Sequence, residues 1–380
     1  MIWLAFPAFV FLTVRLGVVL VNLVSRQWLG STVKPLSGYR TEKARGESLP
    51  MVSVLIPARN EENNLSALLD GLLEQDYPFM EIRIFDDGST DRTGEIIRQF
   101  MERDPRIRAE EGGEDLPEGW NGKNHACHRL ALTARGDYLL FLDADVRVEP
   151  DLVTRAVDRA LAHDLTLLSL FPRQIMLSTG EILTVPIMNW ILLSMLPLRL
   201  VRLSHYPSLA AANGQFMLFR GREYRQHRFH SMVRDINVED IHIIRLIKKM
   251  GYTAETLLSR GEVSCRMYTG YADAIFGFTR SMFAFFGGSG IALFFFTLFT
   301  TLGFVFVWTG MTWSWMVVYL MMVLLLRALV GAMSSQPVLR TLLLSPLVQA
   351  SFVWIVIHSF RKKYRGKNTW KGRVIQFKGI

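Results

Sequence analysis

The sequence predicts an α/β domain with a mostly parallel sheet, enclosed between apolar helices that are long enough to cross a membrane. Strand-like and helix-like patterns alternate from about residue 50 onward, which is typical of such a sheet. Apolar runs lie at 2–24 and again near 288–309, 312–333 and 341–358. Half of all residues are hydrophobic and the mean hydropathy is +0.22, which is more apolar than a purely soluble protein would be.

The elements of the α/β domain follow one another in a regular order. Residues 51–57 (MVSVLIP) predict a buried strand, and leucines at helical spacing predict a helix over 61–75. Residues 81–85 (EIRIF) and 138–142 (YLLFL) predict two further strands. A helix is expected to begin near Pro150, because proline suits the first turn of a helix.

Polar residues follow each of the three predicted strands, at 59–61 (RNE), 86–89 (DDGS) and 143–145 (DAD). In open α/β sheets, ligands bind beyond the carboxyl ends of the strands. We therefore expect the three strand ends to converge on one crevice. No Gly-x-Gly-x-x-Gly pattern follows the first strand, so a dinucleotide cofactor is not expected.

Asp143 and Asp145 are the most informative pair in the chain. Carboxylates two residues apart project from the same side of an extended segment, where they repel each other. A divalent cation bound between them and a ligand would relieve that repulsion, and Mg²⁺ or Mn²⁺ suits such a site. Taken alone, an Asp-x-Asp pair can also arise in any solvated loop.

Two other groups have both a functional and a structural interpretation. Asp86 or Asp87 can accept hydrogen bonds from a base or a ribose, or the Gly-Ser turn can simply cap the next helix. Lys123, in the flexible segment 119–124, can meet a diphosphate or can be solvated.

Charge and cysteine content exclude other classes of protein. The net charge of +9 comes from basic residues beside the apolar segments, and no basic groove with interleaved aromatic residues is evident, so nucleic-acid binding is not expected. Cys127 and Cys265 are expected to be buried free thiols in a reducing compartment.

The basic residues also predict an orientation. Those that follow the first apolar run place the α/β domain in the cytoplasm: Arg26, Lys34, Arg40, Lys43 and Arg45. The basic tail should lie on the same side, whereas three complete C-terminal spans would carry it across. We therefore expect one apolar segment to be re-entrant or to lie along the surface.

The predicted organisation is that of a multi-pass protein of the plasma membrane. Residues 182–203 are apolar but are interrupted by prolines, and a crossing there would separate Asp145 from Asp240. They are expected to form an interfacial helix, with Trp190 at headgroup level and Arg199 and Arg202 near anionic lipid. The expected segments are an anchor (1–24), a basic juxtamembrane linker (25–49), a cytosolic domain (50–280), a transmembrane region (281–360) and a basic tail (361–380). Arg327 should face protein or a lipid headgroup.

Five motifs together resemble the membrane-anchored family-2 glycosyltransferases. They are PARNEE (57–62), DDGSTD (86–91), GWNGK (119–123), DAD (143–145) and VED (238–240). The resemblance covers about residues 50–280 and the flanking anchors. It implies a nucleotide-sugar-binding, GT-A-like fold and inversion at the anomeric carbon. GWNGK, the anchor layout and WKGR in the tail look most like carotenoid-acid and lipid glucosyltransferases.

The resemblance also implies roles for single residues. The donor-binding residues would be Pro57, Arg59 and Glu61 around the uridine, Asp87 at the base or ribose, and Lys123 and Asp143 on the nucleotide sugar. Asp145 would coordinate the metal on the diphosphate, and Asp240 would be the general base. The alternative for Glu239 and Asp240 is a pair of acids in the first turn of a helix, since an apolar helical stripe follows them. Asn213-Gly214-Gln215 is expected on the acceptor side.

One family motif, Gln-x-x-Arg-Trp, is absent. Arg280 lies in about the right region to replace its arginine, and Arg373 is a second candidate. The absence of the motif disfavours a processive polysaccharide synthase.

The expected function is transfer of a sugar, glucose in the first instance, from a UDP-sugar to a membrane-embedded lipid or a terpenoid such as a carotenoid. Two alternatives remain open. One is transfer to a polyprenyl phosphate or a glycolipid, which an arginine cluster suited to a phosphate would favour. The other is a non-catalytic nucleotide-sugar-binding membrane protein, which retention of Asp143, Asp145 and Asp240 disfavours.

Overall fold

The computed structural model describes residues 2–30, 49–112, 116–365, 368–370 and 373–375. The chain divides into two compact units. The sheet unit comprises residues 26–173 and 198–265, and the apolar unit comprises 1–25, 174–197 and 266–380. The predicted boundaries at 50 and 280 followed composition, whereas the contacts assign 174–197 to the apolar helices. Most of the predicted basic linker (25–49) lies outside the described residues.

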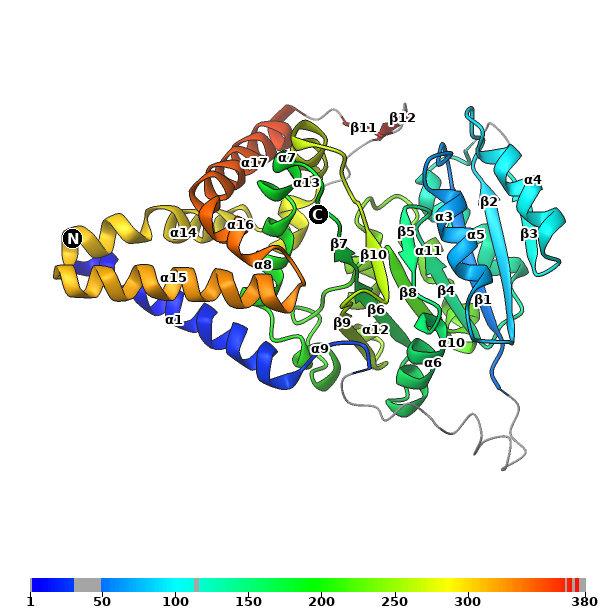
Figure 1. Cartoon of the computed structure of the whole chain (residues 1–380), viewed down its shortest axis with the longest axis horizontal. Helices are drawn as coiled ribbons and strands as arrows, with labels where there is room; N and C mark the ends of the chain where they lie inside the picture. Colours follow the sequence, from blue (N-terminus) through cyan, green and yellow to red (C-terminus); the bar gives the residue numbers. More distant parts are fainter. Residues whose placement is uncertain (1, 31–48, 113–115, 366–367, 371–372, 376–380) are drawn as a thin grey trace. The chain divides into compact units, whose positions relative to one another are not determined.

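The sheet unit is built on a seven-stranded sheet in the order β3-β2-β1-β4-β8-β6-β9 (Figure 1). Its strands are β1 (Val52–Ala58), β2 (Met80–Asp86), β3 (Ile107–Glu111), β4 (Tyr138–Leu142), β6 (Leu167–Phe171), β8 (Phe216–Arg220) and β9 (Ala254–Leu258). β8 is antiparallel to β4 and β6, and the other neighbouring pairs are parallel. The predicted mostly parallel sheet is confirmed.

Helices and short strands complete this unit. The helices are α3 (Leu65–Leu73), α4 (Thr93–Arg103), α5 (Gly122–Thr133), α6 (Leu152–Ala162), α9 (Arg199–Leu203), α10 (Gly221–His227), α11 (Phe229–Met232) and α12 (Glu239–Lys249). β5 (Val146–Val148) pairs antiparallel with β10 (Val263–Cys265), and β7 (Arg173–Gln174) is the last strand before the chain leaves the unit. β2 and β4 are buried along their whole length, as expected of strands in a sheet that is covered on both faces.

The register of the central strands brings three strand ends to one edge of the sheet. Ala58 of β1 pairs with Asp86 of β2, and Leu55 pairs with Phe141 of β4. The segments 59–61, 86–89 and 143–145 therefore leave the sheet at the same edge, as the sequence predicted. This edge carries the candidate site.

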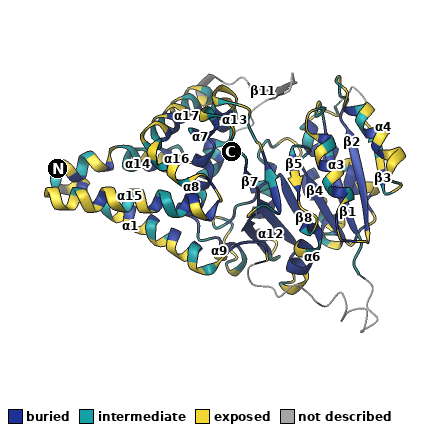
Figure 2. Ribbon diagram, viewed as in Figure 1, coloured by how far each residue is buried: buried dark blue, intermediate teal, exposed yellow. Residues whose placement is uncertain are grey.

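The apolar unit consists of helices and one short hairpin. It contains α1 (Ile2–Ser25), α7 (Thr179–Ile182), α8 (Pro186–Met195), α13 (Tyr271–Phe285), α14 (Gly290–Gly310), α15 (Trp313–Met333), α16 (Val338–Leu343), α17 (Ser345–Arg365), β11 (Asn368–Trp370) and β12 (Arg373–Ile375). Among the described residues, three helices are long and apolar enough to cross a membrane: Trp3–Ser25, Gly290–Gly310 and Trp313–Met333. Their outer surfaces carry exposed apolar side chains, seen in yellow on α1, α14 and α15 (Figure 2).

The third predicted C-terminal span (341–358) corresponds to α16 and α17, which are not among these three helices.

The predicted interfacial helix (182–203) contains two helices, α8 and α9, because Pro186 occupies the first turn of α8 and Pro197 follows its end. The amide of Asn22 donates to the carbonyl oxygens of Leu193 and Leu196, at 2.9 Å each, and fixes α8 against α1. Trp190 is buried among Phe296 and Phe352. The interfacial position of the segment as a whole stays a prediction.

Candidate functional site

The site is centred on Lys123, which forms an ion pair with two acids from different elements. Its Nζ lies 2.7 Å from Oδ1 of Asp143, directly after β4, and 3.0 Å from Oε1 of Glu239, the first residue of α12. Burial lowers the pKa of Lys123, but the two carboxylates raise it, and the result lies well above the ordinary value. Lys123 is therefore a permanent positive charge among acids.

The start of α5 sets the position of Lys123. Oδ1 of Asn121, the residue that caps the helix, accepts a hydrogen bond from the Lys123 backbone N–H at 3.0 Å. The amide nitrogen of Asn121 donates to Oδ1 of Asn237 at 2.7 Å. Asn124 donates to the carbonyl oxygens of Val233 and Ile236. The GWNGK segment is thereby fixed to the segment that precedes α12.

Asp240 lies on the same first turn of α12. Its carboxylate accepts hydrogen bonds from the backbone N–H of Gly214 at 2.9 Å and from its neighbour Ile241 at 2.8 Å. Burial and the nearby Glu239 nevertheless raise the pKa of Asp240 to about 7. Its proton is therefore exchanged close to neutral pH, which is the range that suits a general base.

Gly214 occupies a position where a larger residue would crowd this arrangement. A Cβ atom there would lie 3.1 Å from both Nζ of Lys123 and Oε1 of Glu239. The neighbouring Gln215 accepts the backbone N–H of Asp143 on its carbonyl oxygen at 3.4 Å. The segment expected on the acceptor side thus contacts the Lys123 ion pair directly.

Asp145 has an environment that favours a bound cation. Burial and the charges of Asp143 and Glu61 raise the pKa of its carboxyl group to about 7. The thiol of Cys265 hydrogen-bonds this carboxyl group, yet its Oδ1 is buried without a hydrogen-bond partner in the described part of the chain. An unsatisfied buried carboxylate oxygen beside two other acids fits a divalent cation. No group of three or more metal-ligating side chains occurs among the described residues, so the remaining ligands would be diphosphate oxygens and water.

The loops after β1 and β2 are cross-linked at the same edge. Nη1 of Arg59 donates to the carbonyl oxygen of Asp87 and lies 3.6 Å from its carboxylate. Asn60 adopts a left-handed conformation with φ +54°, and its side-chain oxygen accepts the backbone N–H of Thr90 at 2.8 Å. The Glu61 backbone N–H donates to Oγ1 of Thr93. Pro57 completes the edge at the end of β1, where it pairs with Phe85.

The structure therefore brings together nearly all of the predicted site residues. Pro57, Arg59, Glu61, Asp87, Lys123, Asp143, Asp145 and Asp240 all belong to the sheet unit. Arg280 lies on α13 of the apolar unit, with its guanidinium carbon 5.9 Å from the ring centre of Phe276. Arg373 lies in β12. The roles of these two arginines stay predictions.

Three contacts were not predicted. The sequence predicted Glu239 only as an acid in the first turn of a helix. Its ion pair with Lys123 leaves no local signal, because the two residues are 116 positions apart in the chain. Cys127 and Cys265 are buried free thiols, as predicted. The contact of Cys265 with Asp145, and the 2.7 Å hydrogen bond to its sulfur from Gln215, depend on the pairing of β5 with β10. VED is the only motif that could have indicated Glu239.

A family model described as Glycosyl transferase family 2 matches residues 53–222. A 4,4'-diaponeurosporenoate glycosyltransferase from Staphylococcus haemolyticus is 26% identical over 250 residues, which is 63% of this chain and 63% of that relative. The uncharacterized glycosyltransferase EpsJ from Bacillus subtilis is 32% identical over 117 residues, 31% of this chain and 32% of that one. The chain thus spans less than two thirds of the length of these relatives.

Among solved structures, the mannosyltransferase PcManGT from Pyrobaculum calidifontis, in complex with GDP-Man and Mn²⁺, is similar with a TM-score of 0.51. The identity is 18%, and the match covers 93% of this chain and 99% of that one. The fold and the acidic strand ends define a protein with a GT-A-like α/β domain. Residues 53–222 match glycosyl transferase family 2, the family that the motifs predicted.

Proposed function

We propose that the protein is an inverting glycosyltransferase that moves a sugar, glucose in the first instance, from a UDP-sugar to a membrane-embedded lipid or terpenoid. The observation that carries this proposal is the ion pair of Lys123 with both Asp143 and Glu239, with Asp240 on the same turn of α12 as Glu239. A purely structural ion pair has no need of an adjacent acid whose pKa lies near 7.

The donor would bind at the edge formed by the ends of β1, β2 and β4. Arg59 and Asp87 hold each other in place and would present a rigid surface to the uridine, together with Pro57 and Glu61. Nζ of Lys123 would turn from the carboxylate of Asp143 toward the diphosphate of the donor, because the diphosphate is also an anion and can replace that carboxylate as its partner. The rigid loops would orient the donor before reaction, which lowers the entropic part of the barrier.

The metal ligand from the protein would be Asp145, whose Oδ1 is buried without a hydrogen-bond partner among the described residues. A bound Mg²⁺ or Mn²⁺ would supply positive charge that stabilises the departing UDP. Lys123 would stabilise the same developing charge from the protein side.

Asp240 would accept the proton of an acceptor hydroxyl as that oxygen attacks the anomeric carbon. The backbone N–H groups of Gly214 and Ile241 fix the orientation of its carboxylate. Attack on the face opposite UDP inverts the anomeric centre. An acceptor that attacks through a carboxylate is already ionised, and Asp240 would then only position it.

The three candidate spans support a location in the plasma membrane. α14 and α15 would cross as a hairpin and return the chain to the side on which α14 began. The sheet unit and the tail would then lie on the same side, the cytoplasm by the basic residues after α1. This arrangement removes the conflict that a third C-terminal span would create.

The proposal is tested by UDP release from the purified full chain supplied with UDP-glucose and a membrane-lipid extract. We expect release that needs Mg²⁺ or Mn²⁺, needs the extract, and disappears in Asp145→Asn. Asp70→Asn is the matched control, because Asp70 is an exposed acid on α3 that pairs with Arg103. Metal-dependent UDP binding with no turnover on any donor and extract would instead support a non-catalytic nucleotide-sugar-binding protein.

A further inference from the structure

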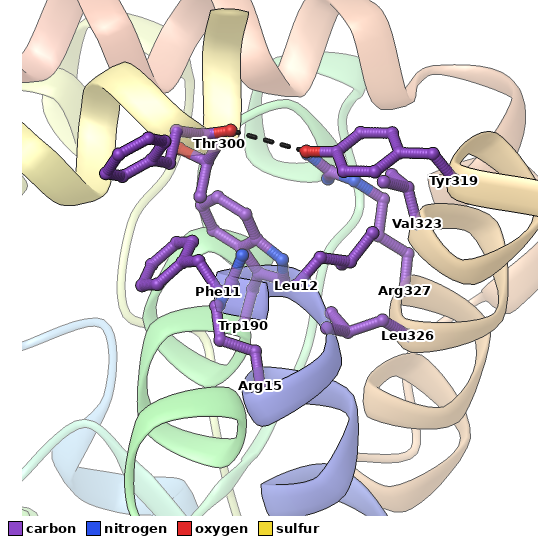
Figure 3. Close-up of a pocket in the computed structure, with 10 residues that line it drawn as sticks. Phe11, Leu12, Arg15, Trp190, Thr300, Tyr319, Val323, Leu326 and Arg327 are labelled. Carbon is purple, nitrogen blue, oxygen red and sulfur yellow. Dashed lines mark hydrogen bonds between the residues drawn. The ribbon is translucent and has the colours of Figure 1, made fainter. Parts of the chain in front are cut away.

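Two arginines of the apolar unit contact one buried tryptophan and line the same pocket with it (Figure 3). The guanidinium carbon of Arg15, on α1, is 4.6 Å from the ring centre of Trp190, and that of Arg327, on α15, is 4.8 Å from it. Arg15 is only 4% exposed. It is about 15 Å along α1 from Ser25, which is half the thickness of a hydrocarbon core.

Neither arginine has an acidic partner in the part of the chain that the structure describes. Nε and Nη2 of Arg15 donate to Oγ of Ser194 at 3.1 and 2.7 Å. Nη2 of Arg327 donates to Oε1 of Gln349 at 2.8 Å, and Gln349 donates in turn to Thr301. All of these partners are neutral. The two positive charges also repel each other.

Two uncompensated charges in apolar helices are costly, and a buried arginine in such helices generally marks a functional site. The contacts with Trp190 offset only part of this cost, because a cation–π contact is modest in strength. The described residues supply no counter-charge beside the two arginines, and an anion from outside would therefore complete this place.

The lining of the pocket indicates what kind of anion fits. Apart from the arginines and Thr300, the side chains around it are apolar or aromatic: Phe11, Leu12, Trp190, Phe299, Tyr319, Val323 and Leu326. The free volume is about 20 Å³, which is room for one or two oxygen atoms of a head group and not for a sugar or a nucleotide. A charged head on a long apolar chain matches both the charge and the lining.

We propose that Arg15 and Arg327 bind the ionised head group, a carboxylate or a phosphate monoester, of a long-chain apolar molecule held by α1, α8 and α15. This inference does not depend on glycosyl transfer, because it concerns binding alone. It identifies an ionised oxygen head on an apolar chain as the chemistry that the apolar unit recognises.

The test is equilibrium binding of three sixteen-carbon probes to the full chain in a neutral detergent. Palmitate and hexadecyl phosphate carry the two anionic heads, and hexadecanol is the neutral control. We expect at least one anionic probe to bind roughly tenfold more tightly than hexadecanol, as two charge-assisted contacts would give. The tighter of the two anionic probes identifies the head group. Equal affinity for all three probes would overturn the proposal.

Variants test whether the two arginines cause the preference for anionic probes over hexadecanol. Arg15→Gln and Arg327→Gln should each lower the ratio of anionic to neutral affinity severalfold, and Arg15→Lys should retain more of it. Lys363→Gln is the matched control, because Lys363 makes a cation–π contact with Phe283 in the same unit and outside the pocket. The ratio is measured within each variant, so a general loss of folding would lower both affinities together. An unchanged ratio in both glutamine variants would contradict the assignment.

Discussion

Two carboxyl groups of the site, those of Asp145 and Asp240, have pKa values raised to about 7. Burial is the largest cause for both, and neighbouring acids add to it. Each group is therefore more easily protonated in the folded protein than in the unfolded chain, where its pKa is about 4. Activity and stability should respond to pH in opposite directions, because activity needs the ionised forms and folding favours the neutral ones.

The first prediction concerns Asp240 as a base. With a hydroxyl acceptor and saturating donor and metal, kcat should rise about tenfold from pH 6 to pH 8, because the ionised fraction of a group with a pKa near 7 changes by that factor. Asp240→Asn should lower kcat by about 10²–10⁴-fold. Steady-state kinetics across this pH range provide the measurement. A flat profile with a small effect of Asp240→Asn would indicate an acceptor that is already ionised.

The second prediction concerns the stability of the protein without metal and donor. The folded pKa of Asp145 is raised, so the stability that its proton provides is complete below about pH 4 and is lost as the pH rises through 7. Asp145→Asn should therefore raise the free energy of unfolding at pH 8 by about 1–3 kcal/mol and change it little at pH 4. Thermal unfolding at the two pH values checks this. Destabilisation at pH 8 would show that the carboxylate is well compensated in the free protein.

At the scale of elements, the site depends on the meeting of three of them: the first turn of α5, the end of β4 and the first turn of α12. Lys123 connects β4 and α12. Gly214, just before β8, lets the backbone approach this ion pair closely.

The third prediction follows from that close approach. Gly214→Ala should displace Lys123 from Glu239, because the added methyl group would lie 3.1 Å from an atom of each. We expect at least a tenfold loss in kcat/KM, as small displacements of catalytic groups are costly. Gly270→Ala is the control, since a Cβ at that position meets nothing within 4 Å. Wild-type kinetics in Gly214→Ala would mean that the ion pair is not needed for catalysis.

Local sequence patterns predicted most of these elements and missed some boundaries. The leucine spacing located α3 correctly, but the helix begins at Leu65 rather than at 61. The preceding residues form a turn instead, in which Asn60 has a positive φ and the Asn64 backbone N–H donates to the carbonyl oxygen of Glu61. A turn of this kind is stabilised by contacts with the loop after β2, and periodicity contains no information about such contacts.

At the scale of the whole molecule, hydropathy indicated one more C-terminal span than the three candidate helices allow. α17 carries polar and basic residues toward its end, and a proline precedes α16. Crossing by α14 and α15 alone would place the start of α14 and the end of α15 on the same side.

The fourth prediction tests this topology. Single cysteines in place of Glu102 and Lys363 should react with a membrane-impermeant maleimide only from the cytoplasmic side, and a cysteine in place of Thr312 only from the other. The unsubstituted chain should not react, because Cys127 and Cys265 are buried. Labelling is compared in intact cells and inverted vesicles. Reaction of the position-363 cysteine from outside would show an additional crossing.

The sequence by itself determined the α/β class, the apolar segments and the identity of the acids at the strand ends, because each of these is a local pattern of side chains. The tertiary structure decided which acid Lys123 meets, how Gly214 limits the space beside it, and that Arg15 and Arg327 both contact Trp190. These contacts join residues that are far apart in the chain. Their charges and distances arise from strand register and helix packing, which no local pattern specifies.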